Sequence, residues 1–325
     1  MLRKNLGIDI GTRQISICSA DEGLLLREPS VAAIEIGSEE VVAVGRRALT
    51  LASKHPKRLR LCWPVWDPVV ENVSVLSVML RMLIDQAIGR TFLRPHIVIS
   101  VPCDLTDAQA DAVEEAVKKA GVARECSLLA APLCAALGAG MDISAPIGQL
   151  LVHVGASRTE VAVIFVSEMV TQMTVPVGGV QFDNAIMEYV QQRHGLMIGK
   201  RAAEQIKMRI GTVYKSAEEK RIEVKGRRAD NGEPGSVTLS SKEMLGAMVD
   251  PLTAVLDAII SVIEQTGEDM RADVAKGGIT LTGGGLLSDM DLFLDEVMGL
   301  RVHRPANAET AAVEGAVIAF TKFDR

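Results

Sequence analysis

Two short segments of this 325-residue chain repeat one pattern, and the repeat restricts the possible folds more than any other feature. Residues 8–11 read IDIG, and residues 152–155, 144 positions further along, read VHVG. Each segment is an apolar strand-like run that ends in a glycine-led turn and leads into a second strand-like run. A duplicated strand–turn–strand unit predicts two related domains that face one another across a cleft.

Length and element order agree with a two-domain α/β protein. A domain commonly holds about 100–200 residues, so the chain is expected to divide into residues 1–148 and 149–325. In the first half, a buried-strand pattern at 97–101 is followed by a helical pattern between Thr106 and Gly121. Such alternation indicates sheets covered by helices.

Helix boundaries and one hairpin can also be predicted. Capping boxes that start at Thr106 and at Ser240 each mark the beginning of a helix. The second helix is expected to run to about residue 266, with Pro251 as a kink. The charged, glycine-bearing stretch 215–235 predicts an exposed hairpin.

Charge and cysteine content exclude several classes of function. Lys and Arg number 35 against 41 Asp and Glu, and the resulting net charge of −6 disfavours nucleic acid as a partner. The five cysteines include no CxxC pair, which suits a reducing cytosol and gives no sign of a zinc site. The charge-free run 126–141 contains Pro132 and is shorter than the roughly 20 apolar residues of a membrane span. We therefore expect a soluble cytosolic protein.

The turn after the first repeated strand has residues that suit a phosphate. Gly11 lets the backbone approach an anion, and Thr12 offers a hydroxyl and an N–H. Asp9, at the strand end, could hold a magnesium ion through water. Asp9 and Thr12 are equally consistent with residues that only satisfy a turn.

Two further features are weak when taken alone. The triplet Gly283–Gly285 follows a strand and is expected near a helix N-terminus, where a flat ligand or phosphate can pack on backbone. Glu204 and Lys207 lie three residues apart on one predicted helix and could bracket a ribose or adenine. Most such pairs are solvated surface charges.

Together these motifs resemble the MreB/Mbl family of the actin-like ATPase superfamily. The resemblance extends over nearly the whole chain and includes GIDIGT at 7–12, VPVGGVQFDNAI at 175–186 and GITLTGGGLL at 278–287. It also includes residues 28–34, 43–45, 97–121, 131–140 and 198–211. It implies an actin-like, ribonuclease H-like α/β fold of two duplicated domains around a nucleotide cleft. Smaller subdomains are implied at about 31–72 and 182–250.

The resemblance also implies an ATP site made of two phosphate loops, a glycine pair, a nucleoside-flanking pair and the glycine triplet. The implied metal ligand is Asp9. The implied nucleotide-binding residues are Asp9, Gly11, Thr12, Arg13, Gly155, Ser157, Arg158, Thr159, Gly178, Gly179, Glu204, Lys207, Gly283, Gly284 and Gly285.

The second phosphate loop departs from the family pattern DIGGGTTE. His153 stands where the family has the aspartate that organises magnesium, and Ala156 and Ser157 replace two glycines. An imidazole nitrogen suits magnesium poorly, and the added side chains crowd backbone that should touch phosphate. Weak ATP binding and doubtful Mg²⁺ binding follow, although Arg158 or His153 could neutralise phosphate charge without the metal.

The family's Glu-Glu-Pro segment reads Ala130-Ala131-Pro132 in this chain. In the family, the second carboxylate resembles the group that positions or activates the attacking water. Alanine cannot do this, and such groups contribute about 10²–10⁴-fold in rate. No catalytic residue is therefore predicted, and hydrolysis is expected to be impaired.

Two surface segments are candidate contacts for a membrane or a partner. The basic run 54–60 is most simply a solvated face. Phe92 and Leu93 lie between Arg90 and Arg94 in a predicted loop, a composition that fits insertion into a lipid surface. The family is similar in using an apolar loop tip for this purpose. A loop that folds back onto its own domain is a nearly equal alternative.

The leading hypothesis is a divergent cytoskeletal protein of the MreB/Mbl type. By resemblance, it would form filaments with copies of itself on the inner face of the cell membrane and organise cell-wall synthesis. A standard MreB and membrane proteins of wall synthesis are implied as partners. The alternative is a protein that does not polymerise alone and regulates, or co-assembles with, a standard MreB. A small-molecule kinase or a chaperone ATPase on the same fold is disfavoured.

Overall fold

The structure, a computed structural model, describes residues 5–66, 69–90, 93–214 and 219–323. The chain divides into two compact units. Unit 1 comprises residues 1–143 and 310–325, and unit 2 comprises residues 144–309. The predicted second domain extended to residue 325, whereas the final helix groups with unit 1. The smaller subdomains at about 31–72 and 182–250 stay a prediction.

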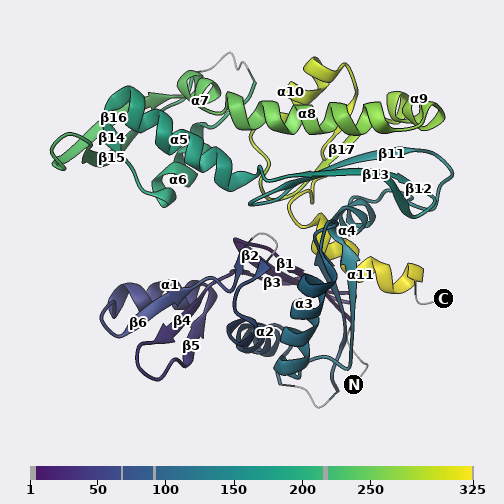
Figure 1. The fold of residues 1–325 in the computed structure, drawn as a ribbon, viewed down its shortest axis with the longest axis horizontal. Helices are drawn as coiled ribbons and strands as arrows, with labels where there is room; N and C mark the ends of the chain where they lie inside the picture. The colour runs from purple at the N-terminus through teal and green to yellow at the C-terminus, as the bar shows by residue number, and fades with distance from the viewer. Residues whose placement is uncertain (1–4, 67–68, 91–92, 215–218, 324–325) are drawn as a thin grey trace. The chain divides into compact units, whose positions relative to one another are not determined.

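Unit 1 is built on a five-stranded mixed sheet with helices packed on it (Figure 1). The strand order is β10-β9-β1-β2-β3, in which β1 pairs parallel with β9 and antiparallel with β2. The strands are β1 (Asn5–Ile10), β2 (Gln14–Ser19), β3 (Gly23–Pro29), β9 (His96–Val101) and β10 (Glu125–Ala130). The helices are α1 (Gly45–Lys54), α2 (Val73–Ile88), α3 (Asp107–Ala120), α4 (Ala131–Gly138) and α11 (Ala311–Phe323).

The core of unit 1 explains why these strands form. Leu6, Ile8, Ile97 and Ile99 are fully buried and belong to one cluster with the apolar residues of α2 and α3. Burying a side chain of this size stabilises the fold by about 1.5–3 kcal/mol. Helix α11 contacts β1, β2 and β9 and packs on α4. A Cβ at Gly315 of α11 would lie 1.7 Å from the Cys134 carbonyl oxygen, so this close helix contact requires glycine.

A smaller sheet lies beside α1 in unit 1 (Figure 1). Its order is β5-β4-β6, and a separate pair of short strands is formed by β7 and β8. These strands are β4 (Ala32–Glu35), β5 (Val41–Val44), β6 (Leu59–Cys62), β7 (Val65–Trp66) and β8 (Val69–Val70). Val31, Ala33, Ala43 and Ala48 form its small core.

Unit 2 has a five-stranded sheet of order β13-β12-β11-β17-β18 and a three-stranded sheet of order β14-β15-β16. The first sheet contains β11 (Gln149–Val154), β12 (Thr159–Phe165), β13 (Glu168–Val175), β17 (Ile279–Thr282) and β18 (Val302–His303). The second contains β14 (Leu196–Met197), β15 (Arg221–Arg228) and β16 (Pro234–Ser240). The helices are α5 (Gly179–His194), α6 (Lys200–Ile210), α7 (Ser241–Ala247), α8 (Val249–Gln265), α9 (Glu268–Gly277) and α10 (Met290–Met298).

The two five-stranded sheets have the same topology. Strands β1, β2, β3, β9 and β10 correspond in order to β11, β12, β13, β17 and β18, with the same parallel and antiparallel pairings. The residue pair Asp9 and Ser16 corresponds to His153 and Glu160, so both hairpin strands keep the 144-residue offset. The duplication inferred from IDIG and VHVG is therefore confirmed at the level of strand order and register.

The predicted capping boxes are both present. Thr106 caps α3 together with Gln109, and Ser240 caps α7 together with Glu243. The predicted hairpin over 215–235 corresponds to β15 and β16, although residues 215–218 lie outside the described residues.

The helix predicted from Ser240 to about residue 266 is divided into two helices, and the kink predicted at Pro251 is present as a break one turn earlier. The first helix ends at Ala247, and α8 begins at Val249 after a bend of 57°. Pro251 explains the position of this break. It has no N–H to donate to the Ala247 carbonyl four residues earlier, and its ring crowds that carbonyl.

No single helix in the described part of the chain is long and apolar enough to cross a membrane, and only the bent α7–α8 pair passes on length and composition. In α8, Leu252, Val255, Ile259 and Val262 are core residues of unit 2.

Candidate functional site

Each unit has a tight turn at the end of its first repeated strand. In unit 1 the Gly11 N–H donates to the Gln14 carbonyl oxygen at 2.9 Å, and in unit 2 the Gly155 N–H donates to the Arg158 carbonyl oxygen at 2.7 Å. Thr12 and Ser157 are buried within these turns, and Arg13 and Arg158 are partly exposed. Both predicted phosphate loops are thus the same closed turn, and each has one arginine.

A row of paired residues crosses each sheet just before the turn. In unit 1 the row is Ser100, Asp9, Ser16 and Arg27. In unit 2 the corresponding row is Thr282, His153, Glu160 and Thr174. Directly paired residues of neighbouring strands project from the same face of a sheet. The two rows therefore place a hydroxyl beside Asp9 in one unit and beside His153 in the other.

Asp9 is a carboxyl held in a partly buried position at the end of β1. Burial raises the pKa of Asp9 to about 6, and the Ser100 hydroxyl and the Arg27 guanidinium oppose this rise. Desolvation of this kind penalises the charged form unless a cation is close. Asp9 therefore suits the role of a group whose charge is stabilised by a bound cation.

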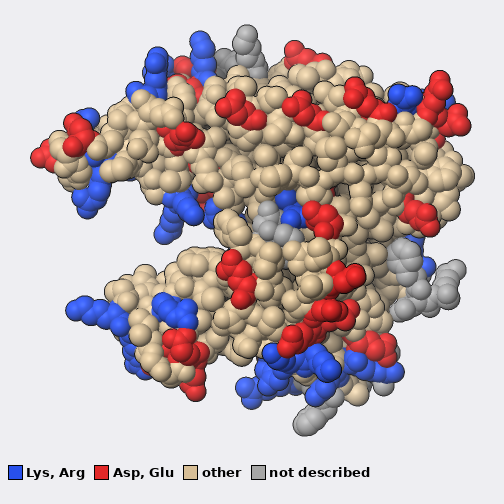
Figure 2. Space-filling model, viewed as in Figure 1, with Lys and Arg blue, Asp and Glu red and all other residues tan. Residues whose placement is uncertain are grey.

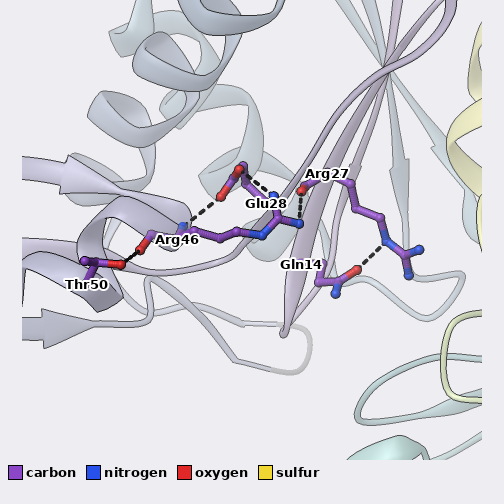
Figure 3. Close-up of polar contacts among 5 residues, drawn as sticks. All are labelled: Gln14, Arg27, Glu28, Arg46 and Thr50. Atoms are coloured by element: carbon purple, nitrogen blue, oxygen red, sulfur yellow. Dashed lines mark hydrogen bonds and ion pairs between the residues drawn. The ribbon is translucent and has the colours of Figure 1, made fainter. Parts of the chain in front are cut away.

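Arg27 lies in the same row as Asp9 and is a cation that the sequence motifs did not reveal. Its Nε donates to the Gln14 side-chain oxygen, which joins β3 to the first turn (Figure 3). The neighbouring Glu28 accepts from the Arg46 N–H at 2.7 Å and from the Arg46 guanidinium at 3.0 Å (Figure 3). The end of β3 thus contacts both the first turn and the N-terminus of α1.

His153 is a partly buried imidazole near the end of β11. Burial lowers its pKa to about 4. Its Nδ1 lies 3.0 Å from Thr282 Oγ1, and Thr282 Oγ1 also lies 3.4 Å from the Val152 carbonyl oxygen. The idea that His153 neutralises phosphate charge is therefore not supported at neutral pH, which leaves Arg158 as the cation of the second turn.

The residues present fit a magnesium site poorly. Asp9 is a suitable oxygen ligand in unit 1, but the corresponding residue of unit 2, His153, offers a neutral nitrogen. Magnesium strongly prefers oxygen ligands. Within the described ranges, no group of three or more His, Cys, Asp and Glu side chains is placed to hold a metal ion.

The glycines predicted in unit 2 lie together around the second turn. A Cβ at Gly178 would lie 2.5 Å from the Gly155 carbonyl oxygen, and a Cβ at Gly285 would lie 2.0 Å from the same oxygen. The Gly179 N–H donates to this oxygen at 3.1 Å. Thr159 fixes the preceding backbone, because its hydroxyl donates to the Val177 carbonyl oxygen at 2.7 Å. These positions require glycine because three backbone segments meet there.

The glycine triplet lies near a helix N-terminus, as predicted, but this helix is not the next one in the sequence. After β17, the helix α10 starts only at Met290, behind Asp289 in a left-handed conformation. Gly285 instead packs against the N-terminus of α5, where a Cβ on Gly179 would lie 3.5 Å from the Gly285 Cα. Gly284 is exposed between the buried Gly283 and Gly285. Tertiary packing, and not sequence order, brings the triplet to a helix N-terminus.

The predicted pair Glu204 and Lys207 lies on α6, and the two side chains have different surroundings. Lys207 Nζ lies 2.8 Å from Asp183 Oδ1 and donates to the Gly179 carbonyl oxygen at 2.6 Å. The Lys207 and Asp183 side chains are 13% and 2% exposed. Lys207 is therefore not a solvated surface charge, and its partner Asp183, from α5, was missed because the pair joins two different helices.

Ala131 occupies the first position of α4, with Pro132 directly after it. Its side chain is 6% exposed and has no polar atom. The position thus lies at a helix N-terminus, where a carboxylate would be favourable. The segment offers no group that could orient or activate water.

Both arginines of the basic run form ion pairs on the surface of unit 1. Arg58 pairs with Glu35 at 2.6 Å, and Arg60 pairs with Glu39. Lys, Arg, Asp and Glu side chains are interspersed over the surface of α1 and β4–β6 (Figure 2). A solvated face explains this run. In the predicted membrane loop, Leu93 is 45% exposed, and Phe92 lies outside the described residues.

Comparison with known proteins agrees with this architecture. The profile of the MreB/Mbl protein family matches residues 3–325. The cell shape-determining protein MreB of Escherichia coli strain K12 is 36% identical over 331 residues, which cover 100% of this chain and 95% of that protein.

Two solved structures show the same fold. MreB5 of Spiroplasma citri bound to AMPPNP gives a TM-score of 0.92 at 24% identity, covering 100% of this chain and 98% of that one. The MamK double helical filament gives a TM-score of 0.81 at 18% identity, covering 98% and 99%. With an actin-like fold and a family profile that matches almost every residue, the chain belongs to the MreB/Mbl family.

Proposed function

We propose that this chain is a cytoskeletal protein that assembles with copies of itself and helps to determine cell shape by organising cell-wall synthesis. The 36% identical relative from Escherichia coli is a cell shape-determining protein. The MamK structure with the same fold is a double helical filament. Membrane proteins of wall synthesis are proposed as partners of this role, together with a standard MreB where the two proteins occur in the same filament.

The protein binds ATP weakly through the turn of each unit. Support comes from the paired turns at Gly11 and Gly155 and from the glycine packing around the second turn. MreB5, which shares the fold, has been solved with AMPPNP. The observation that carries weak binding is the imidazole of His153, 3.0 Å from the Thr282 hydroxyl, at the position that corresponds to the Asp9 carboxyl. Burial lowers the pKa of this imidazole to about 4, so the ring is expected to be neutral near pH 7. A neutral imidazole neither attracts magnesium nor offsets phosphate charge.

Hydrolysis is impaired because Ala131 has no polar atom at the position where the family has a carboxylate. Arg158 still offers a cation near the second turn, so binding without turnover is chemically consistent. The protein then acts through nucleotide occupancy and assembly, with little phosphate release.

The protein acts in the cytoplasm, on the inner face of the cell membrane. Support comes from the exposed Leu93 between Arg90 and Arg94, which suits an apolar tip flanked by cations near lipid phosphates. The substitution pair Phe92→Ala and Leu93→Ala is expected to abolish sedimentation with vesicles that contain anionic lipid. Unchanged sedimentation would refute this part of the proposal.

Calorimetric titration with ATP, with and without magnesium, tests the nucleotide site. We expect weak binding that is nearly unchanged by magnesium. Tight binding that depends on magnesium would contradict the proposal, and no binding at all would indicate a site that has lost the nucleotide.

Sedimentation tests the assembly part. Filaments that pellet on vesicles support the cytoskeletal role. A protein that stays in the supernatant alone, but pellets with a standard MreB, would favour the alternative of a co-assembling regulatory partner.

A further inference from the structure

A buried ion pair fixes the N-terminus of α5 to α6 in unit 2. Lys207 Nζ lies 2.8 Å from Asp183 Oδ1, and the side chains are 13% and 2% exposed. The same ammonium donates to the Gly179 carbonyl oxygen at 2.6 Å. Lys207 therefore contacts both the first residue of α5 and a residue one turn further along that helix.

The N-terminus held by Lys207 is in turn bonded to the second phosphate loop. The Gly179 N–H donates to the Gly155 carbonyl oxygen at 3.1 Å, and the Val180 N–H donates to the Ala156 carbonyl oxygen at 2.7 Å. These N–H groups are among those that a helix N-terminus usually leaves without an intrahelical partner. Here they fix the loop, so any shift of the α5 N-terminus shifts Gly155 and Ala156 with it.

The glycine triplet also contacts the second phosphate loop and the N-terminus of α5. The Gly285 N–H donates to the Val154 carbonyl oxygen at 2.9 Å. A Cβ on Gly179 would lie 3.2 Å from Lys207 Nζ and 3.5 Å from Gly285 Cα. Lys207 Nζ, the α5 N-terminus and the triplet are therefore in close contact, and a side chain at position 179 would require the lysine to shift by a few tenths of an ångström.

We propose that Asp183 and Lys207 are a positioning pair for the second phosphate loop, in which Asp183 holds the ammonium of Lys207 on the Gly179 carbonyl. This inference rests on the proposed nucleotide function and revises one part of the family pattern. Lys207 acts on the nucleotide through the backbone of Gly179, Gly155 and Ala156, and its charge is neutralised by Asp183. Asp183 is a residue of the nucleotide site although it need not touch the nucleotide.

The direction in which Asp183→Asn changes the affinity for ATP distinguishes positioning of the loop from direct contact with the nucleotide. If Lys207 binds the nucleotide by its charge, Asp183→Asn frees that charge and tightens ATP binding. If the pair positions the loop, Asp183→Asn weakens ATP binding as Lys207→Met does. Residues that orient the ligands of a bound metal commonly contribute about 10–100-fold in affinity, and a pair that orients a phosphate loop acts in the same way. We expect a loss of about this size for each variant.

The experiment is a set of ATP titrations on the full-length chain, restricted to variants whose thermal unfolding shows that they are folded. The double variant Asp183→Asn with Lys207→Met should bind no more weakly than the weaker single variant, because both remove one shared contact. Lys207→Arg should recover part of the affinity, since a guanidinium can still pair with Asp183. Lys200→Met, an exposed lysine of the same helix, is the matched control and should bind as the unchanged protein does.

Tighter or unchanged binding in Asp183→Asn, together with weaker binding in Lys207→Met, would overturn the proposal. Additive losses in the double variant would overturn it as well.

If the unchanged protein binds no ATP, the proposed function fails, and hydrogen exchange still decides the positioning role. The amides of Gly179 and Val180 should exchange faster in both single variants, while the C-terminal half of α5 keeps its protection. Equal exchange in all variants would refute the positioning pair without reference to nucleotide.

Discussion

His153 Nδ1 and Thr282 Oγ1 lie 3.0 Å apart across the β11–β17 ladder. The Thr282 hydroxyl oxygen also lies 3.4 Å from the Val152 carbonyl oxygen, so Thr282 connects the imidazole to the backbone of β11. The two units therefore differ chemically at this position. Unit 2 has an imidazole beside the hydroxyl of Thr282, whereas unit 1 has the carboxyl of Asp9 beside the hydroxyl of Ser100.

The first prediction concerns the titration of His153. Burial lowers its pKa to about 4, below the usual value near 6.5. The folded state thus favours the neutral ring, and this contribution to stability is present above about pH 6.5 and is lost as the pH falls towards 4. Between pH 7 and pH 5 the contribution of His153 to the free energy of unfolding should fall by about 2 kcal/mol.

Carbon-13 chemical shifts of labelled histidines check this expectation directly. The chain has five histidines, so the resonance missing from His153→Gln identifies His153. It should remain that of a neutral ring down to pH 5. A midpoint above pH 6 would contradict the proposed neutral site.

The second prediction is that His153→Asp strengthens the dependence of ATP binding on magnesium. The substitution restores an oxygen ligand next to Thr282, in the position that corresponds to Asp9. Calorimetric titrations with and without magnesium should differ by about tenfold or more in affinity, as expected for a restored group near a metal ion. His303→Asp, which places the same charge on an exposed position of β18, should leave the dependence unchanged. An identical response in both variants would show that position 153 does not organise the metal.

The sequence repeat and the structure agree where the determining contacts are local in the chain. The IDIG and VHVG segments predicted matching hairpins, and the register of Asp9 with Ser16 and of His153 with Glu160 confirms them. Capping at Thr106 is also a local interaction, confined to the first turn of one helix. Such features can be inferred from residues close in sequence.

Features that depend on distant segments were missed or misplaced. The apolar face of α11 does not reveal which sheet it covers, and it returns to unit 1 through a contact that Gly315 permits. Asp183 and Lys207 lie on different helices, so spacing along one helix paired Lys207 with Glu204 instead. The triplet at Gly285 reaches the N-terminus of α5 by packing, which its own flanking sequence does not record.

The third prediction separates glycines that are required from glycines that are not. Gly285→Ala should unfold unit 2 or abolish ATP binding, because the new Cβ would lie 2.0 Å from the Gly155 carbonyl oxygen. Gly246→Ala, inside α7 with no atom within 4 Å of the new Cβ, should raise the free energy of unfolding by about 0.5–1 kcal/mol. Urea denaturation of the two variants measures whether the free energy of unfolding falls in Gly285→Ala and rises in Gly246→Ala. A tolerated alanine at position 285 would show that the three backbone segments do not meet as closely as described.

The fourth prediction concerns the absent carboxylate at the N-terminus of α4. Ala131→Glu supplies a group that can orient or activate water, which is typically worth about 10²–10⁴-fold in rate. The helix N-terminus favours its charge, whereas the low exposure of Ala131, 6%, means that the longer side chain must find space. We expect phosphate release from ATP to rise at least tenfold in this variant. Ala130→Glu, one residue earlier and on the strand side of the junction, should leave the rate near background. The measurement is single-turnover phosphate release at saturating ATP, so that weak binding does not hide a faster chemical step. Rapid release by the unchanged protein, or an equal gain from both substitutions, would show that position 131 does not limit the reaction.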